Sequence, residues 1–227
     1  MPTPLLMQSK LSVCSFLKHY CPFKENRSKR IFDIFFSAFV LIIFSPLFLL
    51  IIGLVKISSP GPIFYPSLRV GVQGKTIYCW KFRTMHQNAD AVLYKILETD
   101  PALKEEWSLH FKLKKDPRIT KIGSFLRKSS LDELPQFWNI LKGDLSTVGP
   151  RPISEKEAEI VVEKKLWVMF SVRPGLTGLW QTSGRSHIPF DKRIAIEARY
   201  AKERSFLGDF MIIAKTIPAL IYDRGAY

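Results

Sequence analysis

The sequence predicts an α+β fold that is mainly helical and includes one helical hairpin inserted in a membrane. Three observations lead to this prediction. Residues 34–55 carry no charged side chain, residues 63–70 and 75–84 alternate apolar and polar positions, and most other regular segments have helical periodicity. The 227 residues suffice for one domain with a hydrophobic core plus an accessory segment. We expect an N-terminal extension over 1–27, a membrane helix over 28–57 and a more polar domain over 58–227.

The chain is strongly basic. Its formal net charge is +14, from 34 Lys and Arg against 20 Asp and Glu. Such an excess suits nucleic acid, or an anionic phospholipid surface together with phosphate-bearing ligands, and a basic surface without a partner is the third interpretation. The uncharged run favours the membrane and argues against nucleic acid. Cys14, Cys21 and Cys79 form no CxxC pair, which argues against a zinc site or a disulfide framework.

The apolar run is long enough to cross a bilayer, since a straight helix of its length would measure about 33 Å. Ser45 and Pro46 lie at its middle, where proline removes a backbone hydrogen bond and the serine hydroxyl favours a bend. Both flanks are basic, and positive residues mark the cytoplasmic side. A re-entrant hairpin broken at Ser45-Pro46 is therefore favoured, with a straight span as the alternative. Lys29 and Arg30, one turn before Asp33, are expected to pair with it at the interface; a solvated Asp33 is the other interpretation.

The remaining elements follow from local signals. Residues 1–24 are loosely amphipathic, so they either lie on the membrane or are disordered. The alternating segments on either side of residues 71–74 predict a β-hairpin. Ser154 followed by Glu157 at the third position is a capping box. Helices are expected over 90–98, 102–112, 154–168, 190–204 and 206–222.

The last of these helices carries one apolar stripe at helical spacing. The stripe either packs in the core or rests on lipid as an interfacial amphipathic helix, and the sequence does not separate the two. Its members are Leu207, Phe210, Met211, Ala214, Ile217 and Ile221.

The segment 125–152 holds the best candidates for chemistry. The adjacent carboxylates Asp132 and Glu133 begin an apolar helix-like stretch, shortly after Arg127. A helix N-terminus attracts phosphate, which Arg127 could reach. An ionised Asp132 could attack phosphorus or hold a divalent cation. The alternative is structural: Ser130 and Glu133 match a capping box, unless Asp132 is the N-cap of a helix that tolerates Pro135.

Two turns combine glycine, proline and arginine. Gly149-Pro150-Arg151-Pro152 is the first, and Arg173-Pro174-Gly175 begins the second. Rigid turns that display a guanidinium suit a diphosphate, because arginine makes bidentate bonds to phosphate oxygens. Structural turns with exposed arginines are the alternative. Neither segment is a P-loop or a GxGxxG motif.

Taken together, these segments resemble the bacterial sugar transferases, the monotopic phosphoglycosyl transferases that load polyprenyl phosphate. The resemblance covers residues 28–227 in the family's order, and the chain is similar to the minimal catalytic form with a short N-terminal extension. The matching segments are Lys29-Arg30-x-x-Asp33, Ser45-Pro46, Lys81-Phe82-Arg83-Thr84-Met85, Asp116-Pro117-Arg118-Ile119-Thr120, Leu131-Asp132-Glu133-Leu134-Pro135-Gln136, Gly149-Pro150-Arg151-Pro152 and Arg173-Pro174-Gly175-Leu176-Thr177-Gly178.

The resemblance implies a re-entrant helix with both ends in the cytoplasm and a two-step reaction. Asp132 would attack the β-phosphate of a UDP-sugar, forming a phosphosugar-aspartyl enzyme and releasing UMP, and polyprenyl phosphate would then take the sugar phosphate. Mg²⁺ would bind at Asp132 and Glu133, and Arg127 would hold phosphate. We assign Pro150, Arg151 and Arg173 to the nucleotide diphosphate as our own inference.

The implied setting is the cytoplasmic face of the inner membrane. The acceptor would be undecaprenyl phosphate, the product would initiate an exopolysaccharide, capsule, O-antigen or glycoconjugate, and the C-terminal residues suggest galactose or glucose as the sugar. A homodimer through the membrane-associated surface is a further expectation. The alternative to an enzyme is a membrane-anchored adaptor with a basic cytoplasmic domain, which would account for the apolar run but not for the carboxylate pair beside the arginine-bearing turns.

Overall fold

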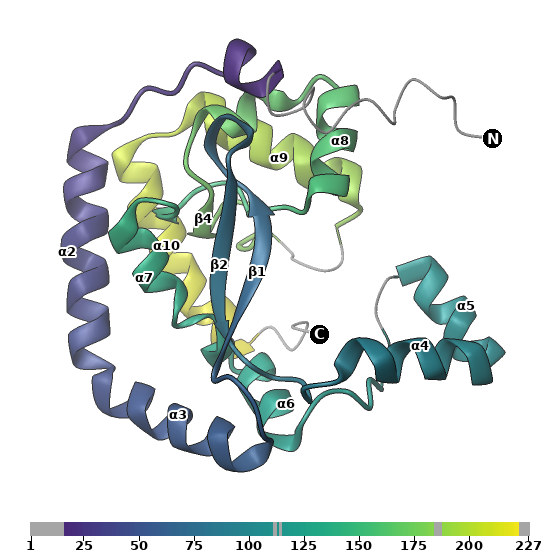
Figure 1. Cartoon of the computed structure of the whole chain (residues 1–227). Helices are drawn as coiled ribbons and strands as arrows, with labels where there is room; N and C mark the ends of the chain where they lie inside the picture. The colour runs from purple at the N-terminus through teal and green to yellow at the C-terminus, as the bar shows by residue number, and fades with distance from the viewer. Residues whose placement is uncertain (1–15, 111–112, 114, 184–187, 223–227) are drawn as a thin grey trace. The chain divides into compact units, whose positions relative to one another are not determined.

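The computed structural model describes residues 16–110, 113, 115–183 and 188–222, and these are mainly helical with two small sheets (Figure 1). This confirms the predicted fold class in outline. The described chain divides into two compact units. The first contains the residues up to 43 together with 66–80 and those from 135 onward, and the second contains 44–65 and 81–134.

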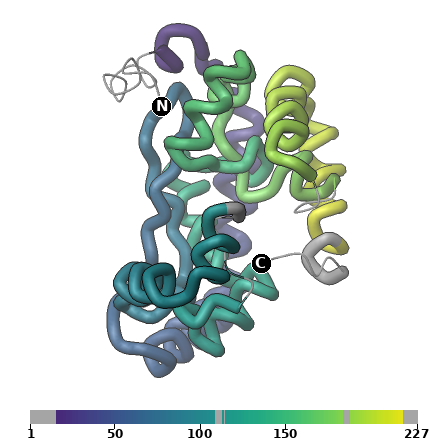
Figure 2. Tube along the Cα trace, turned by 90° about the vertical axis from the view of Figure 1, so that its right-hand side faces the viewer, coloured from purple at the N-terminus to yellow at the C-terminus, as the bar shows by residue number. Residues whose placement is uncertain are grey.

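The first unit packs helices around a short parallel pair of strands. Strands β3 (Ser146–Val148) and β4 (Gly175–Thr177) pair in the register Ser146 with Gly175 and Val148 with Thr177. Helices α9 and α10 lie side by side (Figures 1 and 2), and the Tyr200 hydroxyl of α9 donates to Asp209 of α10 at 2.7 Å. The other elements are α2 (Arg27–Ile43), α7 (Gln136–Lys142), α8 (Glu155–Glu163), the 3₁₀ helix η4 (Trp167–Ser171), α9 (Phe190–Glu203) and α10 (Phe206–Tyr222).

Close backbone contact joins the two glycine-containing turns. A Cβ added at Gly149 would collide with the carbonyl oxygen of Arg173, and one at Gly175 with the amide of Gly149. A Cβ at Gly178 would collide with the Gly149 carbonyl oxygen. These glycines are therefore required because the β3 and β4 segments approach closely, and only a residue without a side chain fits there.

Helix α8 forms for the reason that the sequence predicts, but it ends earlier. The side chain of Ser154 accepts from the Glu157 amide and the Glu157 carboxylate accepts from Ser154, which completes the capping box. The helix ends at Glu163 because Lys165 adopts a left-handed conformation with φ 57°. The expected helix over 154–168 is therefore corrected to a shorter α-helix followed by η4.

The second unit is built on helix α3 (Ser45–Ser58), whose Ile51 and Val55 pack with Phe82 and Leu126 in one buried cluster. Helix α6 (Lys121–Lys128) and the 3₁₀ helix η3 (Leu131–Glu133) complete this core. Helices α4 (Ala89–Thr99) and α5 (Pro101–His110) confirm the two helices expected on either side of Asp100, although residues 111 and 112 lie outside the described part.

The predicted β-hairpin is confirmed. Strand β1 (Phe64–Val70) pairs with β2 (Thr76–Phe82), and the 3₁₀ turn η2 (Val72–Gly74) connects them. Gln73 in this turn has φ 54°, a left-handed conformation that a connection this short requires.

The apolar run forms two helices, α2 and α3, separated at Phe44. No single described helix is long and apolar enough to cross a membrane. Together, the two helices of this pair, bent by 63°, are long and apolar enough, by length and composition alone. The break falls one residue before the predicted Ser45-Pro46, and Pro46 occupies the first turn of α3, where its missing N–H costs nothing. The re-entrant hairpin stays a prediction.

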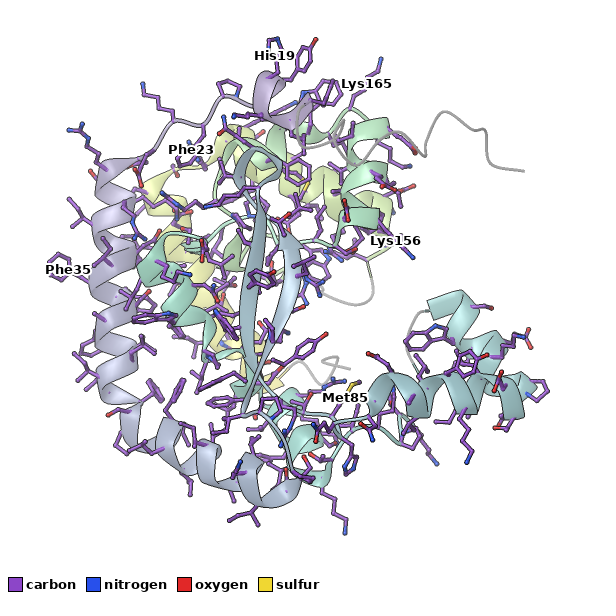
Figure 3. All side chains as sticks on the ribbon, in the orientation of Figure 1. His19, Phe23, Phe35, Met85, Lys156 and Lys165 are labelled. Atoms are coloured by element: carbon purple, nitrogen blue, oxygen red, sulfur yellow. The ribbon has the colours of Figure 1, made fainter. Side chains whose placement is uncertain are left out.

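Large apolar side chains on these helices are exposed. Phe35 of α2 is 72% exposed and points away from the rest of its unit (Figure 3), and Leu49 of α3 is 69% exposed. The predicted stripe on α10 is likewise outside the core: Leu207 is 72% exposed, while the buried face of the helix carries Asp209 and Ile212. Of the two interpretations of the stripe, core packing is therefore wrong for the residues described, and Ile221 lies outside those with described side chains.

Part of the N-terminal extension belongs to the core, which the sequence did not indicate. Residues 16–20 are helical, and Leu17 and Cys21 are buried beside Ile153 and Ile194. The Cys21 thiol also donates to the Trp167 carbonyl at 3.1 Å. Residues 1–15, to which the expectation of an interfacial or disordered segment also applied, lie outside the described part.

Candidate functional site

The second unit brings the predicted carboxylate pair beside a lysine. Between α6 and η3, Ser130 adopts a left-handed conformation with φ 56° and changes the chain direction. The 3₁₀ helix η3 carries Asp132 and Glu133. Lys81, on strand β2, places its ammonium nitrogen 2.6 Å from Glu133 Oε1 and 3.7 Å from Asp132 Oδ2. Both carboxylates therefore face one cationic position.

Asp132 is largely withdrawn from water, with 7% of its surface exposed. Burial raises the pKa of its carboxyl to about 6; the charge of Lys81 opposes this, Glu133 adds to it and Arg127 opposes it. The neighbouring cations Lys81 and Arg127 favour the ionised form against this effect of burial. A carboxylate that is ionised but poorly hydrated would be an activated nucleophile.

Arg127 is held near this pair by a neighbouring loop. It lies in the last turn of α6, and its Nε donates to Thr84 Oγ1 at 2.8 Å. The helix begins at Thr120, whose hydroxyl accepts from the amide of Gly123 at 2.8 Å. A Cβ at Gly123 would collide with the Thr84 carbonyl, so this glycine lets the helix approach the loop closely. Three predicted residues, Arg127, Asp132 and Glu133, thus belong to one unit with Lys81 and Thr84.

Neither helix register proposed from the sequence is formed. Ser130 makes no side-chain capping bond, so the capping box with Glu133 is absent. Asp132 is not an N-cap either, because the α-helix α7 begins only at Gln136, with Pro135 as its cap. Pro135 explains this start, since its ring supplies no N–H and fixes φ at a helical value. The carboxylates are thus presented by a separate 3₁₀ turn.

Asp132 and Glu133 have the donor chemistry that Mg²⁺ requires. Carboxylate oxygens are hard ligands, and Mg²⁺ is typically held by one or two of them together with substrate phosphates. The position between the two carboxylates is taken by the Lys81 ammonium, and the described residues bring no group of three or more His, Cys, Asp and Glu side chains together. Asp132 and Glu133 could therefore supply at most one or two ligands through their remaining oxygen atoms, with the other ligands left to water and phosphate.

The arginine of the first turn lies on an aromatic platform in the first unit. The Arg151 guanidinium is 5.5 Å from the centroid of the Trp180 ring, and Arg193 of α9 is 4.5 Å from the same ring. The Arg151 amide donates to Glu197 at 3.0 Å, and the Pro150 carbonyl accepts from Gly175 at 2.8 Å. Pro150 thus has a structural contact, while the Arg151 side chain faces an indole that the sequence did not indicate.

Arg173 is already engaged by protein groups. Its Nε donates to the Gly143 carbonyl at 2.8 Å, its Nη1 is 2.7 Å from Glu25, and the guanidinium stacks on Phe23 at 5.0 Å. Gly143 is the left-handed C-cap of α7, so Arg173 binds an exposed helix-end carbonyl. These contacts favour the structural interpretation of this turn.

The predicted ion pair of Asp33 with Lys29 or Arg30 is replaced by other partners. Asp33 is 1% exposed and accepts from Ser146 Oγ at 2.8 Å and the Thr147 amide at 2.9 Å. Lys29 pairs instead with Asp209 at 2.6 Å. The correction has a geometric cause, because α2 turns Asp33 toward the neutral donors of β3.

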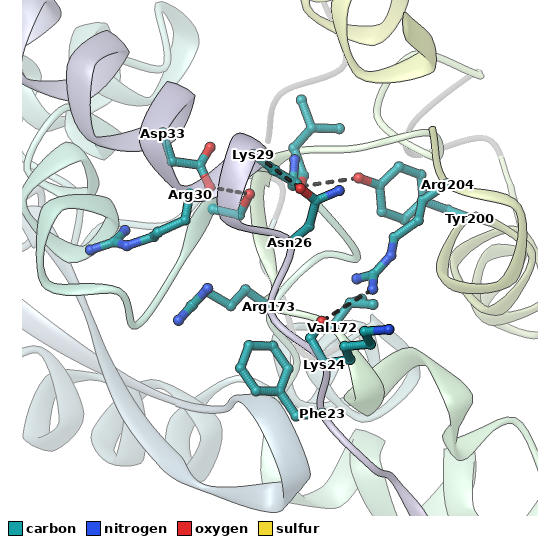
Figure 4. Close-up of a pocket in the computed structure, with 12 residues that line it drawn as sticks. Phe23, Lys24, Asn26, Lys29, Arg30, Asp33, Val172, Arg173, Tyr200 and Arg204 are labelled. Carbon is teal, nitrogen blue, oxygen red and sulfur yellow. Dashed lines mark hydrogen bonds between the residues drawn. The ribbon is translucent and has the colours of Figure 1, made fainter. Parts of the chain in front are cut away.

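Arg30 caps helix α7 by donating to the carbonyls of Ile140 at 2.5 Å and Leu141 at 2.7 Å. Lys29, Arg30 and Asp33 line one small pocket of the first unit together with Arg173 and Tyr200 (Figure 4). Since their charged groups are bonded to protein, the pocket is a structural junction of α2 rather than a second catalytic centre.

Residues that the sequence analysis left without a role include Lys81, Trp180, Arg193 and Glu197. Lys81 stands in the quoted segment 81–85, but the alternation of β2 says only that it lies on a different face from Phe82. Glu197 is 1% exposed in α9, and burial raises the pKa of its carboxyl to about 7. Its place on the apolar face of the helix expected over 190–204 was the signal in the sequence that could have identified Glu197.

Comparison with known proteins identifies the family of the chain. The family model described as bacterial sugar transferase matches residues 24–223. The exopolysaccharide production protein ExoY of Sinorhizobium fredii is 50% identical over 200 residues, which cover 88% of each chain. The undecaprenyl-phosphate galactose phosphotransferase of Salmonella typhimurium is 45% identical over 88% of this chain and 41% of its own. The UDP-glucose:undecaprenyl-phosphate glucose-1-phosphate transferase of Escherichia coli is 35% identical over the same two shares.

The family match spans most of the chain, and the identity to ExoY extends over nearly all of both proteins. The segments that carry Asp132, Glu133 and Arg127 lie within the matched residues. The chain therefore belongs to the bacterial sugar transferase family and is an enzyme of the phosphoglycosyl transferase type.

Proposed function

We propose that this enzyme transfers a hexose-1-phosphate from a UDP-sugar to undecaprenyl phosphate, through a covalent intermediate on Asp132, with release of UMP. The proposed product initiates an exopolysaccharide or related glycan. The names of the relatives support this substrate pair and role, and galactose and glucose, which two of those names contain, are the donor sugars to test first.

The observation that carries the proposal is the setting of Asp132. A carboxylate that is 7% exposed and ionised beside two cations would be a stronger nucleophile than a hydrated one. Lys81 and Arg127 supply positive charge on the neighbouring elements β2 and α6. A nucleophile between cations is suited to an electrophile that carries several negative charges, such as a diphosphate.

The first step would form a bond between an Asp132 oxygen and the β-phosphorus of the donor. The bond from that phosphorus to the bridging oxygen would break, and UMP would leave with the electron pair. In the second step an oxygen of polyprenyl phosphate would attack the same phosphorus. The acyl phosphate bond would break, returning the Asp132 carboxylate and releasing the diphosphate-linked sugar.

Mg²⁺ held by Asp132 and Glu133 would neutralise phosphate oxygens during this chemistry. Lys81 would balance the charge of the two adjacent carboxylates, which otherwise repel one another. Arg127, which keeps further guanidinium donors beyond the Nε bonded to Thr84, would hold phosphate oxygens.

An acceptor with a polyprenyl chain would require the reaction to take place at a membrane. The exposed apolar side chains of α2 and α3, with those of α10, would enter the bilayer, and the excess of basic residues would face anionic phospholipid. We place the active site on the cytoplasmic face of the inner membrane, where UDP-sugars occur, and we keep the re-entrant hairpin as the topology to be tested.

The test is UMP release by detergent-purified protein given undecaprenyl phosphate, Mg²⁺ and a panel of UDP-sugars. Asp132→Asn should abolish release, and chelation of the metal should do the same. Asp191→Asn is the matched control, because Asp191 is an exposed carboxylate on α9 that pairs with Lys164 at the surface. It should keep the full rate.

A labelled sugar phosphate should also remain bound to wild-type protein when the acceptor is omitted, and should not label Asp132→Asn. Absence of UMP release with every UDP-sugar, from protein that binds vesicles normally, would refute the proposed UDP-sugar donor. Release that survives Asp132→Asn would refute the covalent mechanism while leaving the transfer.

A further inference from the structure

The segment Lys81–Thr84 alternates between two sets of contacts within the second unit. Lys81 reaches Asp132 and Glu133, and Thr84 accepts the hydrogen bond from Arg127. The two residues between them face helix α3 instead. Phe82 is 1% exposed and packs with Ile51 and Val55 of that helix.

Arg83 binds the end of the same helix. It is 8% exposed, and its Nη2 donates to the Ser59 carbonyl at 2.6 Å and, at a longer 3.4 Å, to the Val55 carbonyl. The Ser59 carbonyl belongs to the C-cap of α3, beyond the amides of the helix, whereas the Val55 carbonyl in the last turn also accepts from the Ser58 hydroxyl at 3.0 Å. A cation there also complements the negative end of the helix dipole.

The fold makes a special place for this side chain. Gly61 follows α3 with φ 118°, a conformation that favours glycine, and a Cβ at that position would collide with Arg83 Nη1. Among the residues that the structure describes, Nε and Nη1 of Arg83 are buried without a hydrogen-bond partner. An arginine cannot escape this cost by losing its proton. The hydrogen bond of Nη2 to the Ser59 carbonyl offsets part of this cost.

We infer that Arg83 is a positioning residue for the active site. By its hydrogen bonds to the end of α3, it fixes the position of Lys81 relative to Asp132 and Glu133. The backbone supports the same role, since the Arg83 amide donates to the Ile63 carbonyl at 2.8 Å, just beyond the α3 turn. The end of the apolar helix pair and the catalytic carboxylates are thus connected through four consecutive residues. The inference rests on the proposed function, because transfer is its readout.

A double-mutant cycle in the full chain separates positioning from mere folding. Arg83→Met should slow UMP release by roughly tenfold, which is about 1.4 kcal/mol of transition-state stabilisation. In a Lys81→Gln background the same substitution should cost less than about twofold, because the lysine that it positions is absent. Arg83→Lys, which keeps a donor for the Ser59 carbonyl, should restore part of the rate.

Arg30→Met is the matched control, since Arg30 also donates to two helix-end carbonyls but in the first unit. Its effect should be the same in both backgrounds. If Arg83→Met fails to fold, Gly61→Ala offers a second way to displace the Arg83 side chain. If Lys81→Gln releases no measurable UMP, the cycle is measured in Lys81→Arg protein instead. Equal losses from Arg83→Met, or from Gly61→Ala in its place, with and without Lys81 would overturn the inference. Wild-type protein inactive with every UDP-sugar would instead overturn the proposed function.

Discussion

Glu197 should make the stability of the protein depend on pH in the direction opposite to most carboxylates. Its side chain is 1% exposed in α9, where Oε1 accepts the Arg151 amide at 3.0 Å and Oε2 is buried without a partner among the described residues. Burial raises its pKa from 4.5 to about 7, against the smaller lowering effects of the Arg151 amide and the charges of Arg193 and Arg151. The folded state therefore holds the proton more tightly than the unfolded chain does.

The magnitude follows from linkage. Between pH 4.5 and 7 the folded protein binds more protons at this site than the unfolded one, so stability falls as pH rises through this window. A shift of about 2.5 units corresponds to about 3 kcal/mol, present at pH 4.5 and lost above pH 7. Glu197→Gln keeps an acceptor for the Arg151 amide and removes the charge. At pH 8 it should therefore stabilise the protein by up to about 3 kcal/mol.

The assay is thermal unfolding followed by tryptophan fluorescence in detergent, at pH 5 and pH 8. For a chain of this size each kcal/mol moves the midpoint by about 2–4 °C, so Glu197→Gln should raise it by up to roughly 6–12 °C at pH 8. Near pH 5 the two proteins should differ little. A constant difference at both pH values would refute the reasoning, because it would show that the carboxyl does not titrate in this window. Glu203→Gln, at an exposed position of the same helix, is the matched control.

Two further substitutions test the packing of each unit. Asp33→Ala should lower the free energy of unfolding by about 3 kcal/mol, because it leaves the buried Ser146 hydroxyl and the Thr147 amide without their acceptor. Asp33→Asn should cost less. Equal unfolding midpoints for Asp33→Ala and wild type would contradict the assignment. Gly123→Ala should destabilise by about 2 kcal/mol or more, since its Cβ would meet the Thr84 carbonyl, whereas Gly53→Ala in α3 has no atom within 4 Å and should be neutral or stabilising in the same unfolding assay.

Local signals in the sequence predicted local structure well. The capping box of Ser154 and Glu157 formed as expected, and so did the hairpin and the starts of α9 and α10. These features depend on residues within a few positions of one another. The break in the apolar run was also predicted to within one residue, because proline acts on its own turn.

Partners distant in the sequence could not be predicted from spacing. Asp33 lay one turn from two cations, yet its hydrogen bonds are to Ser146 and Thr147, and only the fold brings these groups together. The guanidinium of Arg173 was expected to be free to bind a diphosphate, but it donates a hydrogen bond to the Gly143 carbonyl at the end of α7. The early end of α8 depends on a left-handed Lys165, a conformation for which lysine has no preference.

Some residues of the candidate site were predicted from the sequence and others were not. Asp132 and Glu133 were identified because adjacent carboxylates near an arginine are unusual in an apolar stretch, whereas Lys81 was not, because its strand gives it no distinguishing neighbour. The pairing of Lys81 with Glu133 spans 52 positions of the chain and arises from the turn at Ser130. Electrostatic tuning of the site is therefore a property of the tertiary structure.

The hydrogen bonds of Asp33 also bear on biosynthesis. Ser146 is translated 113 residues after the aspartate that it binds. At typical bacterial elongation rates of about 5–20 residues per second, helix α2 would wait roughly 6–23 s for the strand that satisfies its carboxylate. During that interval the helix would carry an uncompensated acid, which, if α2 enters the membrane as proposed, would favour a shallow location near the headgroups. Final seating of α2 would then be a late event, completed only when the β3 segment has left the ribosome.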